Sequence, residues 1–191
     1  MDLLLMGVLG FIGLVIVVIV LWLVFTYNAL ISTIKQLENS WAQIDVQLKR
    51  RADLIPNLIE TVKGYAKFEK SVLTQVTQAR AALLSAKTPK ESAKADNALS
   101  ATLKTIFAVA EAYPTLKANE NFKALQEELS STENKVAFAR QAFNDEVMIY
   151  NTKVESFPDN ILAGMFQFSA AELLQATESA EERKAPKVSF S

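Results

Sequence analysis

The sequence predicts an all-α protein, with an N-terminal transmembrane helix followed by an elongated antiparallel bundle of about four helices. Three observations predict this fold. Residues Leu3 to Phe25 contain 23 positions without a charged or polar side chain. Residues 28–191 hold only two glycines, Gly64 and Gly164, too few for the tight turns of a sheet protein. Apolar residues in that part recur every three or four positions, the period of a helix with one buried face.

The composition excludes several classes of chemistry. The chain of 191 residues has no His and no Cys, with 20 basic residues against 21 acidic ones. Without His or Cys it has no zinc site with nitrogen or sulfur ligands, no Ser-His-Asp or Cys-His pair and no disulfide. The near-zero net charge gives no overall electrostatic footprint for nucleic acid. We therefore expect a protein that is not an enzyme, that needs no cofactor or metal and that binds no nucleic acid.

The apolar segment from Leu3 to Phe25 has the length of a membrane span. At 1.5 Å per residue it covers about 35 Å, against a hydrocarbon core of about 30 Å. Trp22 and Tyr27 stand near its end, where amphipathic rings prefer the headgroup level. A cleaved signal peptide would need a basic start, a shorter apolar core and a small-x-small cleavage site, none of which the sequence offers. Residues 1–27 are therefore expected to be a retained anchor.

The charges after the span predict its orientation. Lys35 follows it, and then Lys49, Arg50 and Arg51. Because cytoplasmic flanks carry an excess of Lys and Arg, we expect the N-terminus outside and the domain in the cytoplasm.

Residues 28–181 are expected to form the bundle. A first apolar stripe runs from Leu30 to Leu83, with Pro56 in its path. Proline removes a backbone donor and clashes in a helix interior. Two alternatives stay open: Asp53 caps a new helix with Pro56 in its first turn, or one kinked helix continues through Pro56. Gly64, within this stripe, is expected to mark the close approach of another segment.

Two further stripes follow the linker at residues 87–90. The first runs from Leu99 to Tyr113 and ends before Pro114. The second starts after Asn119, a favourable N-cap, and continues to Phe157. A helix of this length, about 58 Å, needs packing partners along its whole stripe. The first long stripe, running antiparallel to it, is the expected partner.

The end of the chain is predicted from local signals alone. Residues 160–168 are apolar and aperiodic, and are expected to form a turn packed on the end of the bundle. Residues 169–172, Ser-Ala-Ala-Glu, have capping-box spacing and are expected to open a short helix that ends near Glu181. Residues 182–191 are expected to be a mobile tail.

The densest polar stretch on the first long helix provides candidate interaction residues: Asp45, Lys49, Arg50, Arg51 and Asp53. One interpretation makes the three cations a site for anionic lipid headgroups or an acidic partner. The favoured interpretation pairs them with Asp45 and Asp53 on the same helix and with groups on the facing helix.

The facing helix carries four polar residues that could form such pairs or fix the register of the two helices: Glu133, Asn134, Arg140 and Asn151. We expect this structural role rather than catalysis.

Several stretches resemble the LemA family of bacterial membrane proteins, in order along essentially the whole chain. The longest, from Trp41 to Leu58, reads WAQIDVQLKRRADLIPNL and is specific because of its length and mixed polarity. Shorter ones lie at residues 61–66, 111–118, 132–134 and 185–190. One departure is Phe68 before Glu69, where the family often has a histidine, which indicates that such a histidine would not be catalytic.

The resemblance implies an N-terminal anchor in the bacterial cytoplasmic (inner) membrane, followed by a helical domain, and it implies no particular enzymatic activity. It also implies a protein partner, with membrane proteins that carry a TPM domain as one class. We therefore expect a membrane-anchored scaffold that assembles with itself or holds other membrane proteins. The alternative is a lipid-interacting envelope-stress module that uses the basic residues and the apolar turn at residues 161–168.

Overall fold

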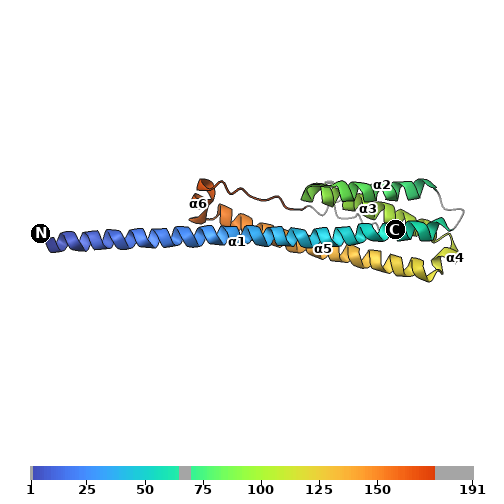
Figure 1. Cartoon of the computed structure of the whole chain (residues 1–191), viewed down its shortest axis with the longest axis horizontal. Helices are drawn as coiled ribbons and strands as arrows, with labels where there is room; N and C mark the ends of the chain where they lie inside the picture. Colours follow the sequence, from blue (N-terminus) through green and yellow to red (C-terminus); the bar gives the residue numbers. More distant parts are fainter. Residues whose placement is uncertain (1, 65–69, 175–191) are drawn as a thin grey trace, which may run out of the picture. The chain divides into compact units, whose positions relative to one another are not determined.

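The computed structural model describes residues 2–64 and 70–174, and all regular structure in these ranges is helical. This confirms the all-α prediction. Four helices are long and two are short (Figure 1): α1 (Asp2–Lys63), α2 (Lys70–Ser85), α3 (Pro89–Ala110), α4 (Pro114–Lys117), α5 (Glu120–Glu155) and α6 (Asp159–Met165). The predicted tail, residues 182–191, and the Phe68–Glu69 pair lie outside the described residues.

The chain divides into two compact units. Among the described residues, unit 1 comprises residues 2–46 and 137–172, and unit 2 comprises residues 47–64, 70–136 and 173–174. Helices α1 and α5 contribute residues to both units.

Helix α1 begins with the apolar segment and continues beyond it without a break. Its large apolar side chains from Leu4 to Leu21, together with Val24 and Phe25, are exposed. A helix that is apolar on all sides and packs against nothing has the properties of a membrane span. Leu3 lies in the same helix.

Pro56 does not break α1, which settles the alternative left open by the sequence. The proline has no N–H to donate to the carbonyl of Ala52, one helical turn earlier. The guanidinium Nε of Arg80, on α2, donates to that carbonyl instead, at 2.8 Å. The helix therefore continues to Lys63, because a side chain from a neighbouring helix replaces the missing amide.

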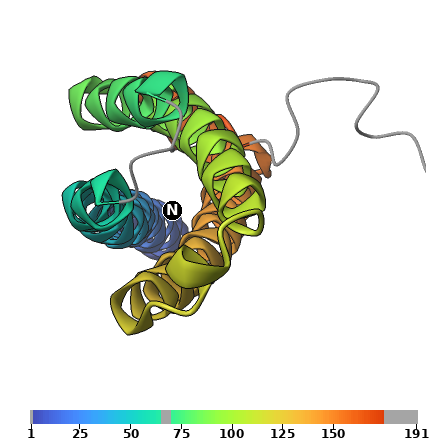
Figure 2. The same ribbon diagram turned by 90° about the vertical axis from the view of Figure 1, so that its right-hand side faces the viewer.

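Unit 2 is a four-helix arrangement of parts of α1 and α5 with α2 and α3. In the end-on view of Figure 2, α3 lies between α2 and α5. The apolar stripes of these four helices face the inside of unit 2. Their buried residues include Ile55, Leu58, Val76, Leu99, Leu103, Ile106, Phe122 and Leu129. Phe107 of α3 packs edge-on against Phe122 of α5, with ring centroids 6.1 Å apart.

Side chains cap two helix starts in unit 2. Thr88 accepts a hydrogen bond from the backbone N–H of Glu91 at 3.2 Å, and Pro89 occupies the first turn. Asn119 accepts one from the N–H of Phe122 at 3.0 Å, which confirms the predicted N-cap of α5.

In unit 1 the part of α1 that follows the apolar segment packs antiparallel to the last part of α5. Leu30 of α1 shares a buried cluster with Tyr150 and Val154 of α5. Farther along α1, Trp41 meets the ring of Phe143 edge-on at 6.0 Å. Rising residue numbers on α1 thus face falling numbers on α5, as the two long stripes predicted.

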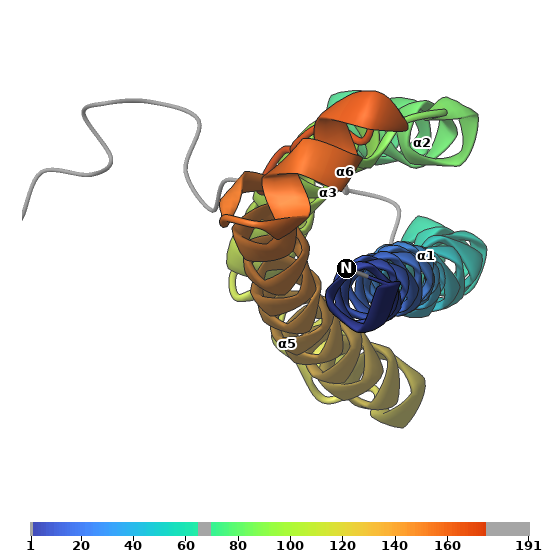
Figure 3. The same cartoon turned by 90° about the vertical axis from the view of Figure 1, so that its left-hand side faces the viewer.

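Three local predictions are wrong. Residues 160–168 are not simply a turn, because residues 159–165 form helix α6, which lies at the C-terminal end of α5 in Figure 3. Residues 169–174 are not helical, and the rest of that predicted helix lies outside the described residues. Gly64 does not mark a close approach of another helix: among the residues that the structure describes, a Cβ there would meet only the carbonyl oxygen of Thr61, at an ordinary 3.6 Å.

Candidate functional site

A buried ion-pair cluster lies inside unit 2, and we call it the Arg51 centre (Arg51, Asp96, Ser100 and Glu133). The side chain of Arg51 is 1% exposed. Its Nη1 donates to Oδ1 of Asp96 at 2.6 Å and to the hydroxyl of Ser100 at 2.8 Å, both on α3. Its Nη2 lies 3.4 Å from Oε2 of Glu133 on α5. One cation from α1 thus joins three helices.

The two carboxylates of this cluster differ in their burial. The Asp96 side chain is 4% exposed, whereas that of Glu133 is 44% exposed. The Nε atom of Arg51 is buried without a hydrogen-bond partner among the described residues. Removing one member of a buried ion pair leaves an unpaired buried charge at a high cost in stability, so the three helices depend on this pairing being kept.

Arg50, the next residue on α1, forms a second and more exposed ion pair. Its Nη2 lies 2.5 Å from Oε1 of Glu128 on α5, and the Arg50 side chain is 56% exposed. Exposed pairs of this kind contribute about 0–1 kcal/mol to stability.

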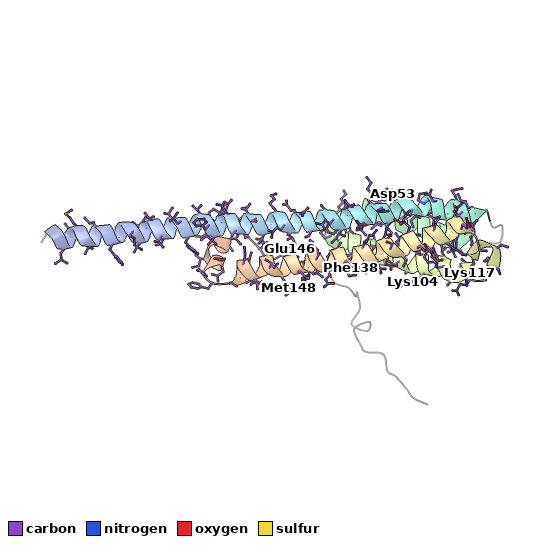
Figure 4. All side chains as sticks on the ribbon, turned by 90° about the horizontal axis from the view of Figure 1, so that it is seen from below. Asp53, Lys104, Lys117, Phe138, Glu146 and Met148 are labelled. Carbon is purple, nitrogen blue, oxygen red and sulfur yellow. The ribbon has the colours of Figure 1, made fainter. Side chains whose placement is uncertain are left out.

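The structure corrects the pairing expected for the cations. Arg50 and Arg51 find their carboxylates on α3 and α5, not at Asp45 and Asp53 on their own helix. Both aspartates are exposed, as is Lys49; Asp53 is labelled in Figure 4. The reason is geometric: Arg51 occupies the inward stripe between Leu48 and Ile55, and therefore points away from the exposed carboxylates.

The residues predicted on α5 separate into different environments. Glu133 joins the Arg51 centre, as the facing-helix interpretation predicted. Asn134 is exposed, and Arg140 is half-buried.

Asn151 forms a clamp on the segment after α6. Its Nδ2 donates to the carbonyl of Ala171 at 3.0 Å, and its Oδ1 accepts from the N–H of Ala171 at 2.8 Å. This two-point contact satisfies both backbone groups of Ala171 without a helix. A side chain twenty residues away thus holds Ala171 in the non-helical segment where the capping-box spacing had predicted a helix.

Sequence reasoning missed Asp96 and Ser100, although a signal for Asp96 exists. Positions 96, 99, 103 and 106 follow the alternating spacing of three and four that defines the buried stripe of α3. A carboxylate in such a stripe requires an inward-facing cation. Arg51 likewise lies in the buried apolar stripe of α1. One charged residue of opposite sign in each of the two buried stripes indicates that the two side chains pair.

Unit 1 carries an exposed apolar surface on α5, which we call the α5 outer face (Phe138, Met148 and Ile149). These side chains are 72%, 60% and 47% exposed, and Phe138 and Met148 are labelled along α5 in Figure 4. At 100° per residue the three lie within an arc of about 100°, opposite the buried stripe of Val136, Phe143, Val147 and Val154. Nothing in the described part of the chain covers them.

Comparison with known proteins identifies the family. The model of the LemA family matches residues 40–190. The chain belongs to the LemA family. The resemblance noted in the sequence is thus confirmed over most of the chain, and the Arg51 centre and the α5 outer face both lie within the matched residues.

Two relatives illustrate the range of the family. The chain is 24% identical over 179 residues to magnetosome protein MamQ 2 of Paramagnetospirillum magneticum, covering 80% of this chain and 66% of the relative. It is 25% identical over 155 residues to protein LemA of Metamycoplasma hominis, covering 79% and 69%. The chain thus spans about two thirds of the length of these relatives.

The membrane assignment follows from the helix and the family together. Within residues 2–64 and 70–174, one helix is long and apolar enough to cross a bilayer, and its most apolar window has no buried residue. With membership of the LemA family, this indicates a single-pass, membrane-associated helical protein.

Proposed function

We propose that the protein is a non-enzymatic scaffold of the bacterial cytoplasmic (inner) membrane, which binds another protein through the α5 outer face. The observation that carries the proposal is the exposure of Phe138, Met148 and Ile149 on a helix whose other side is buried. Phe138 lies about 15 Å along the helix from Met148 and Ile149. The exposed Gln141 and Asp145 lie between them. Exposed apolar side chains among polar neighbours are found at protein interaction surfaces. Aromatic residues and methionine are enriched at the centres of such interfaces.

The charged residues support a structural scaffold rather than a reaction centre. Arg51 is paired with Asp96 and Glu133 and donates a hydrogen bond to Ser100, and Arg50 is paired with Glu128. These contacts stabilise the bundle, and the same pairing lowers the charge available for a lipid headgroup site. Of the three predicted cations, Lys49 is the one that stays exposed without a carboxylate partner among the described residues.

The partner at the α5 outer face is a second copy of this chain or another membrane protein, with TPM-domain proteins as the class that the family resemblance implies. We propose the N-out/C-in orientation because Lys35 and the later cations follow the span. A reporter fused at the C-terminus tests the orientation: cytoplasmic fluorescence supports it, and phosphatase activity outside contradicts it.

Native mass measurement of the full chain extracted in mild detergent tests the scaffold. We compare the unmodified chain with Phe138→Ser and with Leu84→Ser, a matched control on α2 whose side chain is 50% exposed. We expect an assembly that Phe138→Ser dissociates and Leu84→Ser leaves intact. A chain that is strictly monomeric and without a reproducible partner contradicts the proposal, as does equal dissociation by both substitutions.

A further inference from the structure

Helix α6 lies against α1 at the point where the membrane span ends. The hydroxyl of Thr26 donates to Oδ1 of Asp159, in the first turn of α6, at 3.5 Å. The ring of Tyr27 lies 4.9 Å from that of Phe166, just after α6, and 6.1 Å from that of Phe168. Thr26 and Tyr27 directly follow Phe25, the last residue of the exposed apolar segment. The chain between α5 and Ala171 is thus held at the level of the bilayer surface.

One side of α6 is fixed to the helices of unit 1. Leu162 and Ala163 are each 1% exposed, and Ala163 belongs to the cluster with Leu30, Tyr150 and Val154. After α6 the N–H of Phe168 donates to the carbonyl of Ala163 at 2.9 Å. Gln167, between them, has a φ of 60°, so the chain reverses in a capped turn. This packing and the turn hold α6 rigidly beside α1.

Several apolar side chains of α6 and of the residues that flank it are largely exposed among the described residues. Phe157 and Met165 are 80% and 70% exposed, and Ile161 and Phe166 are about half exposed. Ile161 and Met165 are spaced by four residues within α6, so they lie along one side of this helix. Phe157 precedes the helix, and Phe166 follows it. In water, such a surface is unfavourable at a protein's exterior.

The charges around this surface distinguish between possible lipid contacts. Residues 154–174 contain no Lys or Arg, whereas Glu155, Asp159 and Glu172 are acidic. Attraction to anionic headgroups needs basic residues, and none is present here. Apolar contact with the boundary between headgroups and acyl chains needs only the exposed side chains. Because α1 enters the bilayer beside α6, this boundary lies next to the surface.

We propose that α6 with its flanking residues Phe157 and Phe166 is an interfacial foot, whose apolar side chains insert into the headgroup–acyl boundary beside the membrane span. The foot fixes the depth of α1 and the orientation of unit 1 at the surface. The contact is apolar and therefore independent of anionic lipid. This inference rests on the single-pass membrane assignment and not on the scaffold role.

Site-directed spin labelling of the full chain in vesicles tests the foot. The sequence has no cysteine, so single substitutions label one position each. Met165→Cys and Phe157→Cys report on the foot. Asn39→Cys is the control, since Asn39 is exposed on α1 in the same unit, twelve residues or about 18 Å beyond Tyr27. The accessibility of each label to oxygen and to a water-soluble nickel complex is measured in phosphatidylcholine vesicles with and without phosphatidylglycerol.

We expect the two foot labels to show a several-fold higher ratio of oxygen to nickel accessibility than the label at position 39, equally in both vesicle types. Foot labels as accessible to nickel as the control would overturn the proposal. Foot labels shielded from both reagents, with spin–spin broadening, would also overturn it, because a second copy would then cover the surface. A high ratio only with phosphatidylglycerol would refute the apolar mode of contact.

Discussion

Arg80 on α2 donates its Nε–H to the carbonyl of Ala52 on α1 at 2.8 Å, and this carbonyl is the one that Pro56 leaves without a helical donor. Ala52 is fully buried, so its carbonyl has no access to water as a substitute. A side chain of a neighbouring helix therefore makes a proline tolerable inside a helix of 62 residues.

Arg80→Met should lower the free energy of unfolding by about 1–3 kcal/mol, because it leaves a buried carbonyl without a donor. In a Pro56→Ala background, Arg80→Met should lower the free energy of unfolding by less, because the residue at position 56 then donates its own backbone N–H to the carbonyl of Ala52. Urea unfolding of the full chain in detergent micelles, followed by circular dichroism, gives both values as a double-mutant cycle. An equal cost in the two backgrounds would show that Arg80 does not compensate for Pro56.

Arg51→Met should be strongly destabilising, by about 3–5 kcal/mol, because it leaves Asp96 buried without its cation. Arg50→Met is the matched control on the adjacent residue, and its exposed pair with Glu128 should change stability by about 1 kcal/mol or less. Thermal unfolding of the three proteins in the same detergent measures the difference. Similar melting temperatures for the two variants would contradict the structural role of the Arg51 centre.

Asn151→Ala should release the segment after α6, because it removes both hydrogen bonds to Ala171. The loss of two bonds, about 1–3 kcal/mol, corresponds to roughly 5- to 150-fold faster exchange of the Ala171 amide if it opens locally. Hydrogen exchange read by mass spectrometry on residues 168–172 measures this rate. Asn134→Ala, at an exposed position of the same helix, should leave the rate unchanged; unchanged exchange in Asn151→Ala as well would rule out the clamp.

Stability above pH 10 should depend on Tyr150. Burial raises the pKa of this phenol above its ordinary value of 10.0. The unfolded chain then loses the proton at a lower pH than the folded chain does, so this contribution to stability is complete below about pH 10. It declines as the pH rises through the raised pKa of the folded state. Tyr150→Phe should show a smaller loss of unfolding free energy between pH 9 and 11 (about one unit either side of the ordinary value) than the unmodified chain; identical slopes would argue against the burial effect.

The long helices could be predicted from the sequence because their signal is local and repeated. The stripe from Phe122 to Val154 repeats over many turns, and α5 follows it closely. By contrast, α6 has seven residues, less than two full turns, and no period can be recognised over so short a length. Its helical state depends on the burial of Leu162 and Ala163 against residues far away in the sequence.

The candidate site could be predicted only in part, because its pairing is set by tertiary structure. The sequence indicated Arg51 and Glu133 as members, and the structure brings them to 3.4 Å. The principal carboxylate, Asp96, lies 45 residues away on a helix that the sequence did not place against Arg51. The α5 outer face was not predicted, since the inward stripe of the same helix dominates its pattern.

Photocrosslinking in intact membranes tests the scaffold role most directly. A photoreactive amino acid is introduced at position 138 in one protein and at position 84 in another, since Phe138 and Leu84 are both exposed apolar residues in the present structure. We predict that position 138 gives a discrete crosslinked product containing a second copy of the chain or one reproducible membrane protein, and that position 84 does not. The absence of any discrete product at position 138, or the same products from both positions, would contradict a partner-binding surface on α5.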